Sequence, residues 1–151
     1  MRLRLKNHGF TLLELMITAA IMIIVLTGLL ATYVTCLELN ETAKNSNLAL
    51  NAAQDIMERI RSSPDLSTIM NYNASPYNIT SLPANSGLVY VHIDNISADL
   101  LNVSVGACWE QKRSRIIGEC QDIGGIVTFS DNNGNQVLDS PVQLNSLMAQ
   151  R

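Results

Sequence analysis

The sequence predicts an α+β fold, in which one long N-terminal helix packs on a small antiparallel β-sheet. From Thr11 to about Ser62 there is no proline and only one glycine, Gly28, so nothing in that stretch breaks a helix. After about Leu88, short runs alternate apolar and polar side chains, which indicates strands. Of the 151 residues, about a hundred remain beyond the helix, and they are enough for one small core.

The first half of the predicted helix is apolar on all sides, which is typical of a membrane span. Glu14 is the only formal charge between Lys6 and Glu38, and ~20 apolar residues suffice to cross a bilayer. Arg2, Arg4 and Lys6 would stay in the cytoplasm, so the C-terminal bulk would lie across the membrane. A carboxylate in such a segment costs ~2.5 kcal/mol or more near the bilayer centre, and it marks a functional site by default.

The second half of the predicted helix, from Glu38, is amphipathic. Small and apolar residues recur there at helical spacing on one face: Ala49, Ala52, Ala53, Ile56, Met57 and Ile60. That face needs a surface to pack on, and the predicted sheet is the natural candidate. Ser62-Ser63-Pro64 ends the helix, because the residue before a proline is biased away from helical backbone angles.

The octet His8-Gly9-Phe10-Thr11-Leu12-Leu13-Glu14-Leu15 resembles the N-terminal signature of type IV prepilins and type II secretion pseudopilins. That signature has a short basic leader, a glycine before the cleavage point, an apolar first mature residue and a glutamate as the fifth. The resemblance implies that a prepilin peptidase cuts between Gly9 and Phe10, and that Phe10 is N-methylated. It also implies that Glu14 pairs with the terminal amine of a neighbouring subunit in a filament.

A simpler reading of the same stretch is an uncleaved signal anchor, in which Glu14 snorkels to the membrane interface. Such a chain would be a membrane-anchored periplasmic binding module, and it would need neither Gly9 nor Glu14. Cleavage after Gly9 separates the two readings.

The resemblance implies the lollipop fold of type IV pilins, with a helical stem and a β-sheet head. The expected parts are a leader at 1–9, a membrane and assembly half of the helix at 10–37, its amphipathic half at 38–62, a loop at 63–87 and a head at 88–151. One departure is that the membrane half has no proline, whereas many major pilins carry one there.

The stem segment 52–61 is similar to that of PilV-like minor pilins, so a minor pilin of a type IV pilus is the expected function. A type II secretion pseudopilin is the alternative within the same family. The expected partners are the prepilin peptidase, other pilin or pseudopilin subunits contacted through the helix, and the inner membrane. The head would lie in the periplasm of a bacterium until the subunit enters a filament.

Three cysteines fit an exported protein, and two of them lie close in sequence. Cys108 and Cys120 could form a disulfide that joins neighbouring strands, Leu101 to Trp109 and Arg115 to Cys120. Such a bridge would stabilise the fold by ~3 kcal/mol in the loop-entropy description. Cys36 has no evident partner, and the spacing is not that of a zinc site.

An acidic, amide-rich turn follows the predicted strand Gly125 to Ser130. Its oxygen-bearing residues at alternating positions resemble the first part of a calcium loop: Asp131, Asn133, Asn135 and Asp139. The pattern departs from an EF-hand, because Gln136 replaces the invariant glycine and Val142 replaces the bidentate glutamate. Some pilins and pseudopilins carry calcium in such loops, so the resemblance implies a site. The alternative is a plain Asn-Gly hairpin turn.

The remaining residues argue against an enzyme and against nucleic acid as a partner. There is no recognisable Ser/His/Asp set, glycine-rich phosphate loop or metal-ligand cluster. His8 would be lost with the leader, and His92 stands alone in a predicted strand. Loss of the leader also lowers the formal charge from −3 to −6, whereas phosphate binding needs a basic surface. No cofactor is expected other than the calcium considered above.

Overall fold

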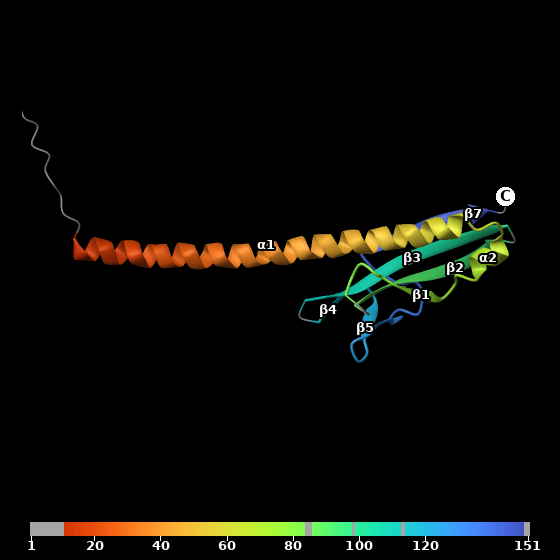
Figure 1. Ribbon diagram of the computed structural model, residues 1–151. Helices are drawn as coiled ribbons and strands as arrows, with labels where there is room; N and C mark the ends of the chain where they lie inside the picture. Colours follow the sequence, from red (N-terminus) through yellow and green to blue (C-terminus); the bar gives the residue numbers. More distant parts are fainter. Residues whose placement is uncertain (1–10, 84–85, 98, 113, 150–151) are drawn as a thin grey trace, which may run out of the picture. The chain divides into compact units, whose positions relative to one another are not determined.

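The computed structural model describes residues 11–83, 86–97, 99–112 and 114–149, and it confirms the α+β class. A long N-terminal helix is followed by a small antiparallel β-sheet (Figure 1). The elements are α1 (Leu12–Arg61), α2 (Leu66–Met70), β1 (Ser75–Asn78), β2 (Gly87–Ser97), β3 (Leu100–Gln111), β4 (Arg115–Ile117), β5 (Cys120–Asp122), β6 (Val127–Phe129) and β7 (Val142–Ala149). The chain forms two compact units, Met1–Glu41 and Thr42–Arg151.

Helix α1 runs without a break from Leu12 to Arg61, within one residue of the predicted limits at each end. Gly28 does not interrupt it, and no heavy atom lies within 4 Å of the place where a Cβ would stand. After Arg61 the chain tightens into a last turn, in which Ser63 N donates to Ile60 O at 3.1 Å. Pro64 follows and cannot continue the helix.

The main sheet is built around β3, and all of its strand pairs are antiparallel. The order β1-β2-β3-β4 runs across the sheet. β3 pairs with β2 along one edge; along its other edge it pairs first with β7, at Leu100 to Ala107, and then with β4, at Trp109 to Gln111. Strands β5 and β6 form a separate two-stranded sheet.

The C-terminal part of α1 packs on one face of the main sheet, as its amphipathic pattern predicts. Ala49, Ala53 and Ile60 are fully buried in the main core, with Ile56 and Met57 beside them. The sheet supplies alternate residues of β2 and β3, among them Val91, Val103, Val105 and Trp109. Trp109, the only tryptophan in the sequence, is fully buried and anchors this core.

The opposite face of the sheet carries a smaller apolar cluster under the β5-β6 sheet. Its buried members are Leu88, Cys108, Val127 and Leu138. Leu88 of β2 and Cys108 of β3 alternate along their strands with residues of the main core, and therefore point to the opposite face of the sheet. Tyr90 of β2 stacks on Phe129 of β6, with ring centroids 4.0 Å apart. The two sheets therefore share a packed interface.

The segment 63–87, predicted to be a loop, instead contains α2 and β1. β1 pairs with β2 from Ser75–Val91 to Asn78–Leu88, so it is an edge strand of the main sheet. Pro76 hid this strand in the sequence, but an edge strand tolerates proline because one side of its backbone needs no partner. Tyr72 and Tyr77 lie close together in the same segment, with ring centroids 6.4 Å apart.

The Asn-Gly turn does not make the hairpin that the dipeptide suggested. β6 pairs with β5, whereas β7, which the sequence did not predict, pairs with β3. The connection between β6 and β7 passes over β3 at Gly106, where a Cβ would stand 2.5 Å from the Leu138 carbonyl oxygen. Because Gly106 has no side chain, the connection between β6 and β7 can cross β3 there and reach the edge of β3 opposite β2, where β7 pairs.

Candidate functional site

The first turn of α1 holds Glu14 in a defined place. Glu14 is the third residue of the helix, and its backbone N–H donates to Thr11 Oγ1 at 3.3 Å. The Thr-x-x-Glu pattern at Thr11 to Glu14 is the sequence form of a capping box and could have indicated this start of the helix. A carboxylate there also gains ~0.3–1 kcal/mol from the positive end of the helix dipole at an exposed site.

The Glu14 carboxylate itself makes no hydrogen bond or ion pair with the part of the chain that the structure describes. Within that part of the chain, only the backbone N–H of Glu14 takes part in the cap. Gly9 and Phe10, the predicted cleavage pair, lie outside the described residues. Cleavage between them stays a prediction.

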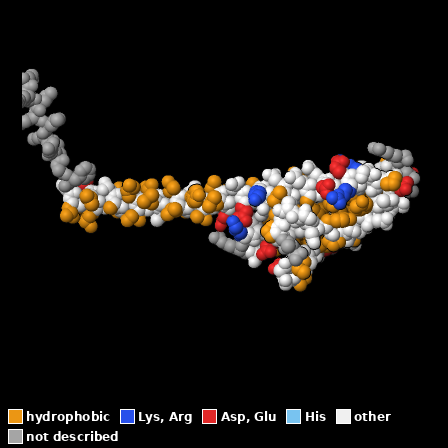
Figure 2. Space-filling model, in the orientation of Figure 1, with side chains coloured by type: hydrophobic (Ala, Val, Ile, Leu, Met, Phe, Trp, Pro, Cys, Tyr) orange, Lys and Arg blue, Asp and Glu red, His pale blue; other side chains and the backbone are white. Residues whose placement is uncertain are grey.

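The helix around Glu14 is long and apolar enough to cross a membrane. Its most hydrophobic window has a mean hydropathy of 2.5, and none of that window is buried within the structure. Figure 2 shows apolar side chains along this stretch of α1, and they are exposed from Leu12 to Leu39. These side chains need either a bilayer or other apolar helices around them.

The threonines in this apolar half satisfy their hydroxyl groups within the helix. Thr18 donates to Leu15 O at 3.0 Å, Thr32 to Gly28 O at 3.0 Å, and Thr35 to Ala31 O at 3.1 Å. Thr27 donates to the carbonyl groups of Ile23 and Ile24. These hydrogen bonds to the helix backbone lower the free-energy cost of placing the threonine hydroxyl groups in a bilayer. Glu14 is then the side chain of this segment whose burial in a bilayer would cost most.

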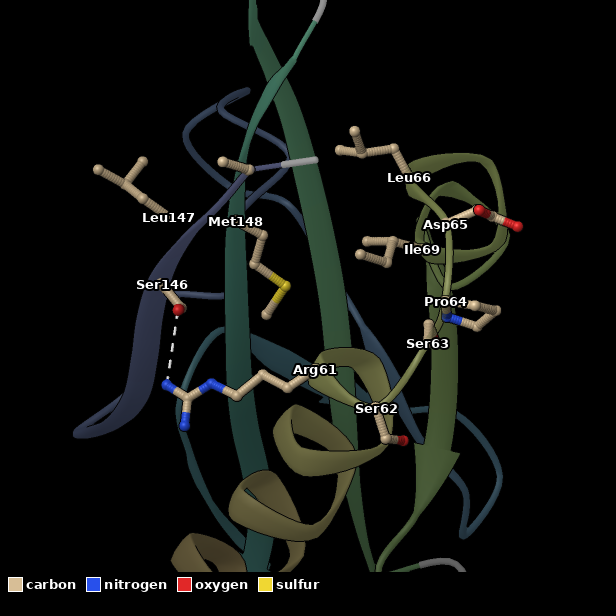
Figure 3. A pocket seen from close by; sticks show the side chains of 11 residues that line it. Arg61, Ser62, Ser63, Pro64, Asp65, Leu66, Ile69, Ser146, Leu147 and Met148 are labelled. Carbon is tan, nitrogen blue, oxygen red and sulfur yellow. Dashed lines mark hydrogen bonds between the residues drawn. The ribbon is translucent and has the colours of Figure 1, made fainter. Parts of the chain in front are cut away.

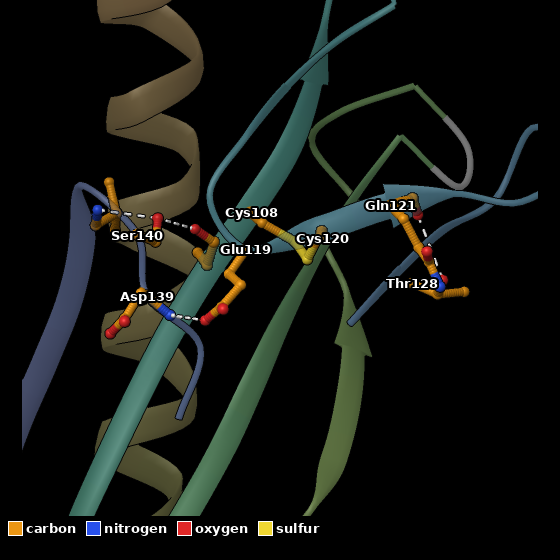
Figure 4. Close-up of a disulfide and its surroundings, with 9 residues drawn as sticks. Cys108, Glu119, Cys120, Gln121, Thr128, Asp139 and Ser140 are labelled. Carbon is orange, nitrogen blue, oxygen red and sulfur yellow. Dashed lines mark hydrogen bonds between the residues drawn. A yellow bond between two sulfur atoms is a disulfide. The ribbon is translucent and has the colours of Figure 1, made fainter. Parts of the chain in front are cut away.

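Cys108 and Cys120 form the predicted disulfide, but it joins elements other than those expected (Figure 4). Cys120 belongs to β5 of the small sheet, not to a strand beside β3. The bridge therefore ties the small sheet to the main one, and its Cα atoms are 6.4 Å apart. Cys36 is exposed on α1 and has no disulfide in the described chain.

Glu119, next to this disulfide, holds the loop between β6 and β7 in place. Its carboxylate accepts the backbone N–H of Asn132 at 2.8 Å and that of Asp139 at 3.4 Å. Ser140 then donates its hydroxyl to Ala107 O of β3 (Figure 4). These bonds position the segment that leads into β7.

The four residues proposed to bind calcium use their side chains within their own loop. Asp131 accepts the backbone N–H of Gly134 at 2.6 Å and that of Gln136 at 2.9 Å. Asn133 Oδ1 accepts Asn135 N, and Asn135 Oδ1 accepts Val137 N. The backbone bonds, with that from Gln136 the largest cause, lower the pKa of Asp131.

The side-chain amide N–H of Asn133 also donates a hydrogen bond to the Asp139 carboxylate, at 2.7 Å. Two of the four predicted calcium ligands are therefore hydrogen-bonded to each other. Within the described residues, no group of three or more His, Cys, Asp or Glu side chains could hold a metal ion. The residues as arranged form a hydrogen-bonded turn. Calcium binding stays an untested prediction.

His92 does not stand alone, contrary to the sequence prediction. It is buried in β2, and its Nε2 lies 2.9 Å from Asp94 Oδ1. The two residues are two apart on one strand and therefore point to the same face, which the sequence could have indicated. The contact gives the buried ring a polar partner.

Comparison with known proteins gives a match at the N-terminal segment that contains Glu14. Residues 4–30 match the family model described as the prokaryotic N-terminal methylation motif. Neither the curated proteins nor the solved structures compared with the chain include a match. The matched stretch contains Gly9, Phe10 and Glu14 together with the first half of the apolar helix. The chain therefore carries the signature of type IV prepilins at its N-terminus.

Proposed function

We propose that this chain is a minor pilin, a structural subunit that enters a type IV pilus through its N-terminal helix. The supporting observation is the prepilin-type signature at the head of an uninterrupted, exposed apolar helix. The precursor would sit in the inner membrane with its leader in the cytoplasm and its head in the periplasm. A prepilin peptidase would cut after Gly9 and methylate Phe10.

Glu14 would set the axial position of the subunit in the filament. Cleavage creates a cationic terminal amine on Phe10, and both that amine and the Glu14 carboxylate lose hydration among packed apolar helices. Pairing between neighbours offsets part of this cost, and only one axial stagger brings the two charges together. Among the residues that the structure describes, the Glu14 carboxylate has no partner and only its backbone N–H serves the helix cap, which supports this role.

The experiment compares variants that separate the charge from the cap. Glu14→Gln keeps the size of the side chain and removes its charge, whereas Thr11→Ala weakens the cap, by ~0.5–2 kcal/mol, and keeps the charge. We expect both to be cleaved normally, and only Glu14→Gln to be depleted from sheared filaments. Normal incorporation of Glu14→Gln would refute the proposed role.

The distinction between a minor pilin and a type II secretion pseudopilin rests on the stem, where segment 52–61 is similar to PilV-like proteins. A minor pilin would be found at low abundance in sheared surface pili, and its deletion would alter piliation. A pseudopilin would instead be absent from surface pili, and its deletion would stop protein secretion. We also propose that the chain has no enzymatic activity, since proteins with this signature are structural in general.

A further inference from the structure

The Asn133-Gly134 dipeptide has a chemical reactivity that its place in a turn does not explain. It is the only Asn-Gly pair in the sequence, and both residues are exposed in the connection between β6 and β7. A glycine leaves its backbone nitrogen open to approach by the preceding side chain, so asparagine deamidates most readily before glycine. No heavy atom lies within 4 Å of the place where a Gly134 Cβ would stand, so nothing crowds this backbone.

Deamidation is a reaction between these two residues and water. The Gly134 backbone nitrogen, once it has lost its proton, attacks Cγ of Asn133 and forms a new N–Cγ bond in a cyclic succinimide. The bond from Cγ to Nδ2 breaks, and Nδ2 leaves as ammonia with a proton returned by the solvent. Water then opens the ring and leaves an aspartate or an isoaspartate at position 133. No oxidant, reductant or enzyme is needed.

In the folded loop, hydrogen bonds occupy every group that this reaction uses. The Gly134 N–H donates to Asp131 Oδ1 at 2.6 Å. The Asn133 side chain is held at both of its polar atoms: Oδ1 accepts the backbone N–H of Asn135 at 3.0 Å, and Nδ2 donates to Asp139 Oδ2 at 2.7 Å. These bonds restrict the side chain, and the Asp131 carboxylate opposes the negative charge that Gly134 N must acquire.

We propose that Asn133 is a site of spontaneous deamidation, which the carboxylates of Asp131 and Asp139 hold back while the loop 131–139 is closed. The reaction then takes place in molecules whose loop has opened, because opening releases the Gly134 N–H and the Asn133 side chain together. Since the lost ammonia is not returned, modification at position 133 records how often the loop has opened.

Deamidation would in turn loosen the loop. A carboxylate at position 133 donates no hydrogen bond to Asp139 and places a like charge beside it. Asp139 follows the buried Leu138, and its backbone N–H and C=O are both hydrogen-bonded to Glu119. The disturbance should therefore extend to the start of β7.

The far end of β7 is anchored independently of this loop (Figure 3). Arg61 donates to Ser146 Oγ at 3.5 Å, and Met148 points from β7 toward the buried Ile69 of α2. After deamidation, the backbone amides near Val142 should exchange their hydrogens faster, whereas those near Ser146 and Met148 should keep their rates.

The first test compares the folded and the unfolded chain. The purified full-length protein is kept in detergent at mildly alkaline pH, with or without guanidinium chloride and a reductant. Samples are digested at low pH, and deamidation of the Asn133 peptide is followed by mass spectrometry. We expect the folded chain to react at least about tenfold more slowly, as loss of a charge-assisted hydrogen bond implies. Equal rates, or no reaction in the unfolded chain, would overturn the proposal.

Two matched variants then test the role of Asp131. Asp131→Ala should speed deamidation of the folded chain by at least about fivefold. Asp122→Ala is the control: Asp122 Oδ1 accepts the Gly125 N–H at 2.8 Å in the turn between β5 and β6, so its loss should leave the Asn133 rate unchanged. A slower reaction in Asp131→Ala would show that this carboxylate acts as a base, and equal acceleration in both variants would show general loosening. Either result would overturn the proposal.

Asp139→Ala keeps the test decisive if Asp131→Ala fails to fold, which the fluorescence of Trp109 reports. Among the described residues, the exposed Asp139 side chain bonds only to Asn133, so its loss should preserve the fold and speed deamidation by a few fold. An unchanged rate would overturn the role of Asp139.

The variant Asn133→Asp reproduces one product of the reaction and tests its effect. Hydrogen exchange should become faster near Val142 and not near Met148, and exchange that is unchanged at both ends of β7 would overturn the proposed loosening. None of these results depends on cleavage after Gly9, so they stand apart from the test of the proposed function.

Discussion

At Gly106, the addition of a single methyl group should destabilise the head. A Cβ added there would stand 2.5 Å from Leu138 O, 3.0 Å from Leu138 Cβ and 3.1 Å from Leu138 Cδ2. The nearest atom belongs to the backbone, so rotation of a side chain cannot relieve the overlap. Gly106→Ala must therefore push the connection between β6 and β7 away from β3.

The size of the effect follows from two opposing contributions. Overpacking of this kind costs ~1–3 kcal/mol. Replacing glycine with alanine recovers ~0.4–1 kcal/mol, because the unfolded chain loses conformational freedom and the backbone at Gly106 has an ordinary φ. We expect Gly106→Ala to lower the free energy of unfolding of the head by about 1–2 kcal/mol.

The assay is urea unfolding of the full chain in detergent, followed by the fluorescence of Trp109, which is fully buried in β3. Gly28→Ala is the control, since no atom lies within 4 Å of its added Cβ and it should not move the head transition. An unchanged or raised midpoint for Gly106→Ala would refute the proposed crossing of the loop over β3.

Three further predictions concern the disulfide and the ionisable groups of the head. Replacing Cys108 and Cys120 with alanine should lower the unfolding free energy by ~3 kcal/mol in the same assay, because the bridge spans 12 residues of sequence. Burial, with the Asp131 charge as a smaller cause, raises the pKa of Tyr90. The neutral Tyr90 side chain therefore contributes stability below pH ~10, and this contribution is lost as the pH rises through the pKa of the folded state. Above pH ~10, the free energy of unfolding of the wild type should fall more than that of Tyr90→Phe. The lowered pKa of Asp131 acts in the opposite direction: its contribution is present above pH ~4 and lost as the pH falls through the folded-state pKa, and Asp131→Asn should remove that dependence.

Features set by local chemistry were predictable from the sequence. The uninterrupted run from Thr11 to Ser62 predicted α1 to within one residue at each end, because no proline interrupts the run and Pro64 follows its end. The apolar face that begins near Ala49 and the strand alternation around Val103 were predicted for a similar reason. Each element buries the side chains that its own period places on one face.

Features set by tertiary pairing were not predictable in the same way. β1 contains Pro76 and exists because β2 lies beside it. β7 has no strict alternation, since Leu144, Leu147 and Met148 follow a spacing that also suits a helix, and its pairing partner lies about forty residues earlier in the chain. The disulfide between Cys108 and Cys120 was predicted correctly. The strand that contains Cys120 was not: Cys120 begins β5 of the small sheet, whereas the sequence placed it on a strand beside β3.

The central claim is that the N-terminus is a processed prepilin signature, and cleavage tests it most directly. The measurement is the intact mass and the N-terminal peptide of the chain, produced with and without a prepilin peptidase. We expect a mature chain that begins at Phe10 and carries a methyl group only when the peptidase is present. A chain that keeps Met1 in both conditions would contradict it and would favour an uncleaved membrane-anchored module.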